Sequence, residues 1–287
     1  MHALRVLVLT AVMAATLPAS AQALDKAWEA TGLANPESVL WDTARKVIYV
    51  SNVNGAPSDK DGNGFISKLS PEGRLITEKW VTGLDAPKGM ALVKGRLYVS
   101  DIDRLVAVDV GSGKIVKTWA APGAKFLNDV TADDAGNVYV SDMLDDAIWR
   151  LASGRFDKWL TDPMLESPNG LKIDKGRLVI AAWGPMTGDG VATARPGALK
   201  AVSIADRMVR DLGPRFGNLD GLEPDGKGGW LVGDGQGGGL FQVDRRGQAR
   251  RIQSLDQGAA DIGTIPEQKL VLVPMMRHGR VVAYRLP

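Results

Sequence analysis

The sequence contains no cysteine and only two histidines among its 287 residues. The absence of cysteine excludes disulfides and cysteine chemistry. His2 lies at the extreme N-terminus, so His278 is the one histidine left for a folded domain, and a Ser-His-Asp triad is excluded. The formal net charge is only +2, which argues against nucleic acid or a membrane surface as a partner.

Long apolar runs are confined to the N-terminus. Residues 1–5 carry one positive charge, residues 6–17 are apolar but for two threonines, and Ala19-Ser20-Ala21 offers a small-residue cleavage site. This pattern is typical of a secretory signal peptide, and the run is too short to span a bilayer comfortably. We therefore expect residues 1–23 to be removed, residues 24–287 to form one domain, and the mature protein to be periplasmic or secreted.

Glycine and proline, in contrast, are spread along the whole length, with 34 Gly and 15 Pro, as in chains of many short strands joined by turns. The segment TGLANPES (31–38) aligns without a gap with TGLDAPKG (82–89). An apolar strand such as VIYVSN (47–52) or VYVSD (138–142) follows each of these segments. One polar position, the slot, recurs at intervals of about 40 or 50 residues, at Glu37, Lys88, Asn128, Asn169, Asp220 and, less clearly, Asp261.

The repeat predicts an all-β, six-bladed β-propeller. Four short strands in roughly forty residues form the unit of a propeller blade, and each slot marks one blade. The last blade has three strands of its own before the chain ends at Pro287, and KAWEATGL (26–33) resembles the blade-ending EKWVTGL (78–84). We therefore predict that the N-terminal strand of the mature chain completes the last blade, which also removes an exposed sheet edge.

The slots are expected to converge on the mouth of a central channel, because the first strand of each propeller blade lines that channel. Polar groups in a partly desolvated channel cost free energy unless they are satisfied. Carboxylate and amide oxygens are hard ligands that suit Ca²⁺, Mg²⁺ or Mn²⁺. The alternative is that Asn and Asp begin these strands as turn formers, and this interpretation is kept for Lys88 and Asp261.

Four motifs, in order and over the whole mature chain, make the sequence resemble the gluconolactonase and senescence-marker-protein family of six-bladed propellers. They are PES-x-x-WD (36–42), LND-x-x-x-D (127–133), PNGL-x-x-D (168–174) and LDGL-x-x-D (219–225). The resemblance implies a divalent metal, Ca²⁺ in the first place with Mg²⁺, Mn²⁺ or Zn²⁺ as alternatives. Its ligands would be Glu37, Asn169 and Asp220.

The resemblance also implies a lactonase-type hydrolase, in which a metal polarises the carbonyl and acidifies a bound water. Asp220 would be the catalytic residue, as ligand or as adjacent base, with Asp129 as the second candidate for the base. A small-molecule substrate would meet Asn128, Asp129 and Trp183. The alternative is a periplasmic binding or scaffold propeller that keeps the metal without turnover.

Two positions depart from the family pattern. Phe126 stands where sugar-acid lactonases of the family place an arginine, and Ser38 stands where glycine is usual. The chain therefore retains the family's metal ligands better than its substrate pocket. The sequence does not identify the substrate or the oligomeric state.

Two of the slot intervals are longer by about ten residues, which places insertions in the first and fourth blades. The first insertion contains Asp59, Asp61 and Asn63 in DKDGNGFI (59–66), the core pattern of a calcium loop. Ser70 replaces the final bidentate glutamate, so this segment is either a second calcium site or a polar hairpin tip. The second insertion, 184–197, is either a lid over the channel or only a long loop.

Overall fold

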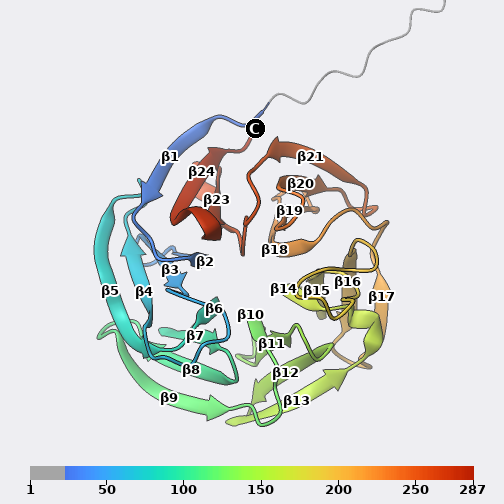
Figure 1. Ribbon diagram of the computed structural model, residues 1–287, viewed down its shortest axis with the longest axis horizontal. Helices are drawn as coiled ribbons and strands as arrows, with labels where there is room; N and C mark the ends of the chain where they lie inside the picture. Colours follow the sequence, from blue (N-terminus) through green and yellow to red (C-terminus); the bar gives the residue numbers. More distant parts are fainter. Residues whose placement is uncertain (1–22) are drawn as a thin grey trace, which may run out of the picture.

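Six four-stranded antiparallel sheets are arranged as blades around a central axis, which confirms the six-bladed propeller (Figure 1). The structure is a computed structural model that describes residues 23–287. Its three helical elements are short 3-10 helices, and no helix in this range is long and apolar enough to cross a membrane. The predicted signal peptide, residues 1–23, lies outside the described residues but for Ala23.

In each blade the strands lie side by side in the following order from the channel outward. Blade 1 consists of β2 (Pro36–Asp42), β3 (Val47–Asn52), β4 (Gly64–Leu69) and β5 (Leu75–Leu84), and blade 2 of β6 (Pro87–Val93), β7 (Arg96–Asp101), β8 (Arg104–Asp109) and β9 (Lys114–Ala120). Blade 3 consists of β10 (Leu127–Ala132), β11 (Val138–Asp142), β12 (Ala147–Ala152) and β13 (Arg155–Thr161), and blade 4 of β14 (Pro168–Asp174), β15 (Arg177–Ala182), β16 (Leu199–Ser203) and β17 (Val209–Asp211). Blade 5 consists of β18 (Leu219–Pro224), β19 (Trp230–Asp234), β20 (Gly239–Val243) and β21 (Ala249–Ser254).

Blade 6 is completed by the N-terminal strand, as predicted. Its strands are β22 (Gly263–Ile265), β23 (Leu270–Met275), β24 (Arg280–Arg285) and, outermost, β1 (Lys26–Thr31). β1 pairs with β24 in a register that runs from Lys26 opposite Tyr284 to Thr31 opposite Arg280. The two ends of the chain thus meet in one sheet. The helices η1 (Pro163–Leu165), η2 (Pro266–Gln268) and η3 (Met276–His278) lie in connections between strands.

The hydrophobic core lies between neighbouring blades. β-Branched and aromatic residues fill strands such as β3, whose successive side chains point to opposite faces of the sheet. Ile48 is fully buried against residues of blade 6, whereas Tyr49 is fully buried against residues of blade 2. Since every blade packs on both faces in this way, the inner strands have a fixed position around the channel.

The inner strand of each of the first five blades begins with a β-bulge. In β2 the register shifts between Pro36 and Val39, and β18 shifts between Leu219 and Leu222; β6, β10 and β14 do the same. Bulges re-aim the side chains beside them. The predicted slot is the second residue of each of these strands, so it lies inside the bulge.

Both predicted insertions connect the second and third strands of a blade, at residues 53–63 in blade 1 and 183–198 in blade 4. Because neighbouring strands are antiparallel, these connections lie at the same end of the blade as the start of the inner strand. In Figure 1 both loops cross the face turned toward the viewer. This face therefore carries the mouth of the channel.

Candidate functional site at the channel mouth

Five of the six predicted slot residues occupy equivalent positions around the channel mouth. Each is the second residue of an inner strand, and the exposed fractions of these residues lie between 1 and 8 %. They are Glu37, Lys88, Asn128, Asn169 and Asp220. The fold thus brings the predicted metal ligands and the predicted substrate contact Asn128 to one buried place.

The sequence predicts the sixth slot at Asp261, but the structure places Ala260 there. Ala259 pairs with Met275 in blade 6 as Pro36 pairs with Asn52 in blade 1, and the slot is the residue that follows. Asp261 is therefore one position further along the strand. The prediction is wrong by one residue because blade 6 has no polar side chain in its slot, and Asp261 is the nearest polar residue to it.

Four buried side-chain oxygens at this mouth have no hydrogen-bond partner. All of the unpaired buried side-chain oxygens among residues 23–287 belong to this group, which comprises Glu37 Oε2, Asn128 Oδ1, Asp220 Oδ1 and Asp261 Oδ1. Each unpaired buried polar atom costs roughly 1–3 kcal/mol. Such a concentration indicates a site built to receive a cation or a hydrogen-bond donor.

The carboxyl groups of Glu37, Asp220 and Asp261 repel one another. Burial raises the pKa of Glu37 well above its usual range, and the carboxyls of Asp220 and Asp261 raise it further. Burial and the charge of Asp261 also raise the pKa of Asp220, although a hydrogen bond with Asn169 opposes this. A divalent cation would relieve the repulsion, because positive charge favours the ionised form of every neighbouring carboxyl.

The predicted ligand set of Glu37, Asn169 and Asp220 fits a hard cation in its chemistry. It supplies carboxylate and amide oxygens, and two of the four unpaired oxygens belong to it. Within residues 23–287, no three His, Cys, Asp or Glu side chains form a metal-ligating group by themselves, and the predicted set includes the amide of Asn169. Ca²⁺ accepts such a mixture, since it takes roughly six to eight oxygens that include amide carbonyls and waters.

Lys88 connects the first insertion to the mouth, a role that the sequence did not reveal. Its Nζ donates to the carbonyls of Pro57 at 2.9 Å and Ala86 at 3.0 Å, and it lies 4.3 Å from the centroid of the Phe126 ring. Burial lowers the pKa of Lys88 to about 8, although the carboxyl of Glu37 opposes this. The turn-former interpretation does not describe Lys88, because its side chain bridges two loops.

Asp129 fastens blade 3 to blade 4. Its Oδ1 accepts a hydrogen bond from the amide of Val130 at 2.6 Å, and Oδ2 accepts one from the amide of Leu171 at 2.5 Å. Burial raises the pKa of Asp129 to about 7, and the positive charge of Lys172 is the largest opposing effect. Both oxygens of this predicted base and substrate contact are thus engaged with backbone amides, which favours a structural role.

Asp261 fastens blade 6 to blade 1 in a similar way. Its backbone amide donates to the carbonyl of Glu37 at 2.9 Å, and its Oδ2 accepts a hydrogen bond from Ser38 Oγ at 2.5 Å. On the side of blade 5, a Cβ at Gly221 would lie 2.5 Å from Asp261 Oδ1. Only glycine therefore fits where Asp261 approaches blade 5. The serine that departs from the family pattern therefore takes part in closing the ring.

Trp183, predicted as a substrate contact, and Asp220 both lie close to Gly235. Its Nε1 donates to the carbonyl of Val191 in the second insertion at 2.9 Å. A Cβ at Gly235 would lie 2.9 Å from Trp183 Cζ3 and 3.2 Å from Asp220 Oδ2. The absence of a side chain at Gly235 thus lets the indole ring approach the predicted catalytic carboxylate.

A buried ion cluster anchors the second insertion. Glu166 accepts hydrogen bonds from Arg195 at 2.7 Å and from Arg215 at 2.7 and 2.9 Å, and Lys200 Nζ lies 2.9 Å from its Oε2. Burial alone would raise the pKa of Glu166, but these hydrogen bonds lower it to about 2. Because Arg195 belongs to the insertion, the cluster fixes that loop next to Trp183.

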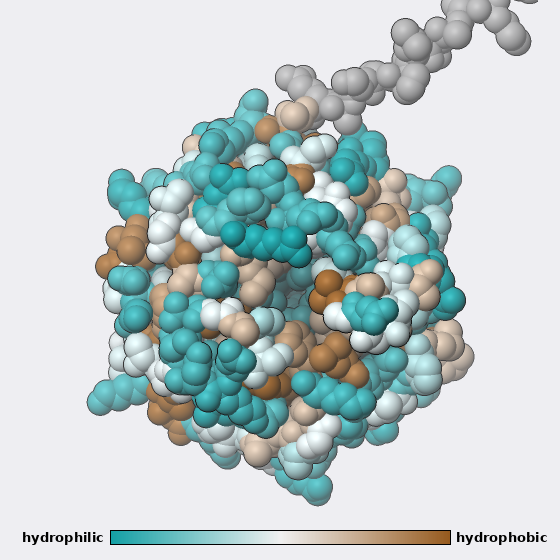
Figure 2. Space-filling model, in the orientation of Figure 1, coloured by the Kyte–Doolittle hydropathy of each residue, from teal (hydrophilic) through white to brown (hydrophobic). Residues whose placement is uncertain are grey.

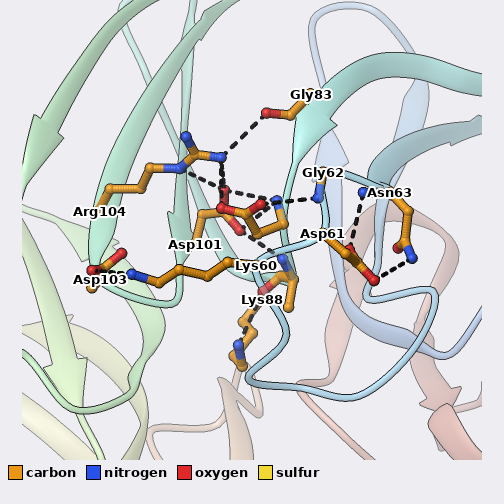
Figure 3. A network of polar contacts seen from close by, with 11 residues as sticks. Lys60, Asp61, Gly62, Asn63, Gly83, Lys88, Asp101, Asp103 and Arg104 are labelled. Carbon is orange, nitrogen blue, oxygen red and sulfur yellow. Dashed lines mark hydrogen bonds and ion pairs between the residues drawn. The ribbon is translucent and has the colours of Figure 1, made fainter.

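The predicted calcium loop is held by internal hydrogen bonds (Figure 3). Asp61 accepts from the backbone amide of Asn63 at 3.2 Å and from its side-chain amide at 2.5 Å. Lys60 forms an ion pair with Asp103 of blade 2, and Gly62 N donates to Asp85 Oδ1. With Asp61 and Asn63 satisfying one another, the contacts favour a polar hairpin tip docked on blade 2.

This arrangement gives a testable expectation for the loop. The variant Asp61→Ala is expected to bind calcium with the same stoichiometry as the unmodified chain, because its carboxylate is already engaged with Asn63. Isothermal titration calorimetry measures this directly. A drop of one bound calcium per chain in Asp61→Ala, but not in Asp157→Ala on an exposed strand, would show that the loop is a calcium site after all.

No family model and no curated protein matches the sequence. Solved structures do share its fold. A gluconolactonase from Xanthomonas campestris superposes with a TM-score of 0.68 at 15% identity, over 93% of this chain and 88% of that one. A luciferin-regenerating enzyme gives a TM-score of 0.63 at 15% identity, over 90% and 95%, and a streptogramin B lyase gives 0.64 at 10% identity, over 92% and 97%.

Proteins of different activity thus have this architecture, and the fold by itself does not select a reaction. By its architecture, the chain is a six-bladed β-propeller with the fold of the gluconolactonase-like proteins.

Proposed function

We propose that the chain is a divalent-cation-dependent hydrolase that opens a lactone or a related ester at the channel mouth. The observation that carries this proposal is the group of four unpaired buried oxygens. Three of them belong to Glu37, Asn128 and Asp220, which the sequence predicts as metal ligands or as the substrate contact. The shared fold with a gluconolactonase supports the reaction class.

Glu37, Asn169 and Asp220 are the residues that would hold the cation. When bound, a divalent cation polarises an ester carbonyl and makes a nearby water more acidic. Asn128 would orient the substrate; its side chain lies in the same ring of slots and its Oδ1 is unpaired, which supports this role. The burial of all four side chains strengthens each electrostatic interaction, because little water is present to screen it.

Asp220 is the residue proposed to move the proton. It accepts a proton from water as the water oxygen adds to the carbonyl carbon. The bond between this carbon and the ring oxygen then breaks, and the proton passes from Asp220 to the departing oxygen, which gives a hydroxy acid. The ring of Trp183 lies close to Asp220 across Gly235 and excludes bulk water from this side of the site.

Chelation tests the proposal most directly. Hydrolysis of a panel of lactones is expected to stop in the presence of a metal chelator and to return when Ca²⁺ is added in excess. The variant Glu37→Gln is expected to bind the cation more weakly and to lose activity, whereas Glu78→Gln on the exposed strand β5 serves as its matched control.

Two outcomes would speak against the proposal in different ways. Activity that survives both chelation and Glu37→Gln would refute cation dependence. Cation binding in calorimetry without turnover of any ester would support the alternative of a binding or scaffold propeller.

We also propose a periplasmic or secreted location, and N-terminal sequencing of the exported protein would show whether it begins near residue 24.

A further inference from the structure

An apolar collar surrounds the ring of polar slots. It consists of the residue that directly follows the second strand of each blade, which is Val53, Ile102, Met143, Trp183, Gly235 or Met276. Their positions are equivalent: in every blade but the second, the backbone amide of the collar residue donates to the carbonyl two residues before the slot. Examples are Met143 to Phe126 at 3.0 Å and Trp183 to Ser167 at 2.9 Å.

The collar is in contact with the groups that the proposed reaction uses. Asn128 Nδ2 lies 3.5 Å from Met143 Sδ, and Trp183 approaches Asp220 across Gly235, the one collar position without a side chain. Any substrate portion next to Asn128 or Asp220 would therefore meet a thioether or an indole ring.

Three collar residues pack together on the other side of the mouth. Val53, Ile102 and Ala86 form one buried apolar cluster, against which Met276 packs. This cluster joins blades 6, 1 and 2. Figure 2 shows brown and tan surfaces bordering the hollow at the centre of the face that carries the mouth.

The one cation of the slot ring does not offset this apolar character. Lys88 directs hydrogen bonds to the carbonyls of Pro57 and Ala86 and rests on the ring of Phe126. Hydroxyl groups of a polyhydroxylated substrate that lie against the collar would lose hydrogen bonds to water without finding replacements, which costs binding free energy. An alkyl or aryl group would gain by leaving water.

We infer that the substrate carries an apolar group beside its reacting carbonyl, as an alkyl- or aryl-substituted lactone or ester does, and is not a polyhydroxylated sugar lactone. The hydrolysis of such a compound rests on the proposed function. The preference for the apolar group is a property of the collar, so it can be measured separately by binding.

Turnover is tested with γ-lactones whose alkyl side chain grows from none to six carbons, beside gluconolactone. The value of kcat/KM is expected to rise about fourfold for each of the first methylenes, and gluconolactone is expected to be the poorest substrate. Met143→Gln keeps the length of the side chain but makes it polar, and it is expected to flatten this dependence. Met208→Gln, at a residue that is 69 % exposed, is the matched control.

Binding is tested with γ-lactams of the same chain lengths, which resist hydrolysis, in calorimetry with Ca²⁺ present. An affinity that rises about fourfold per methylene, and rises less in Met143→Gln, supports the inference. It does so even if no lactone is hydrolysed, because the absence of turnover would contradict only the proposed hydrolysis. Affinity independent of chain length, or tighter binding of a polyhydroxylated lactam, overturns the inference.

Discussion

The variant Asp220→Asn is expected to lower kcat/KM for the best lactone by about a thousandfold or more, because the proposed mechanism makes this one residue both a cation ligand and the proton acceptor. Asparagine keeps the size of the side chain and can still meet Asn169, so the change tests charge more than packing. The measurement is steady-state kinetics at saturating Ca²⁺, paired with a calorimetric titration of the cation, for which the affinity is expected to fall as well.

Asp157→Asn provides the comparison, since that carboxylate lies on the outer strand β13 with an exposed side chain. It is expected to keep its activity and its cation affinity. Activity of Asp220→Asn within tenfold of the unmodified chain would remove Asp220 from the chemistry. Lost cation affinity with full activity would separate the two roles that are assigned to it here.

The variant Glu166→Gln is expected to lose about 3 kcal/mol of unfolding free energy at pH 7. The pKa of Glu166 is about 2 in the folded chain, against 4.5 for a free glutamate. Since the folded-state pKa is the lower one, the stabilisation is complete above pH 4.5 and disappears as the pH falls toward 2. The difference between the variant and the unmodified chain is therefore expected to shrink to roughly half at pH 3.

Urea denaturation at the two pH values measures this difference. Glu72→Gln, whose side chain is 59% exposed and forms a surface ion pair, is expected to change stability by less than about 1 kcal/mol at either pH. An equal loss at pH 7 and pH 3 for Glu166→Gln would mean that its carboxylate charge is not what holds Arg195, Lys200 and Arg215.

Selectivity among substituted lactones should also relax in Glu166→Gln, because Arg195 no longer fixes the insertion beside Trp183.

The propeller fold could be predicted because each blade repeats a short local sequence pattern. The slot, the apolar second strand and the turn glycines recur in each blade, and the similarity of residues 26–33 to residues 78–84 located the strand that completes blade 6. The position of the site followed from the same repeat. The predicted slot residue was wrong only in blade 6, where Ala260 occupies the slot in place of Asp261. That slot is defined by the pairing of Ala259 with Met275, which the local sequence pattern does not reveal.

What the sequence did not reveal are contacts between segments far apart in the chain. Lys88 meets Pro57 and Phe126, and Glu166 meets Arg195 and Arg215, through loops whose course no local pattern specifies. The residues of the collar follow the repeat, yet their apolar character is ordinary for a strand end, so only their assembly around one channel shows what they share.

The pairing of β1 with β24 has a consequence for how the chain acquires its structure. Trp28 and its neighbours pair with residues near position 284 within blade 6, and Asp261 accepts a hydrogen bond from Ser38 between blade 6 and blade 1. Closing so long a loop carries an entropic cost and slows folding. Neither contact can form until nearly the whole chain has been synthesised, so the ring cannot close around blades 1–5 before blade 6 is present. Blade 6 lies between blade 1, which carries Glu37, and blade 5, which carries Asp220. The proposed cation site is therefore complete only in the closed ring.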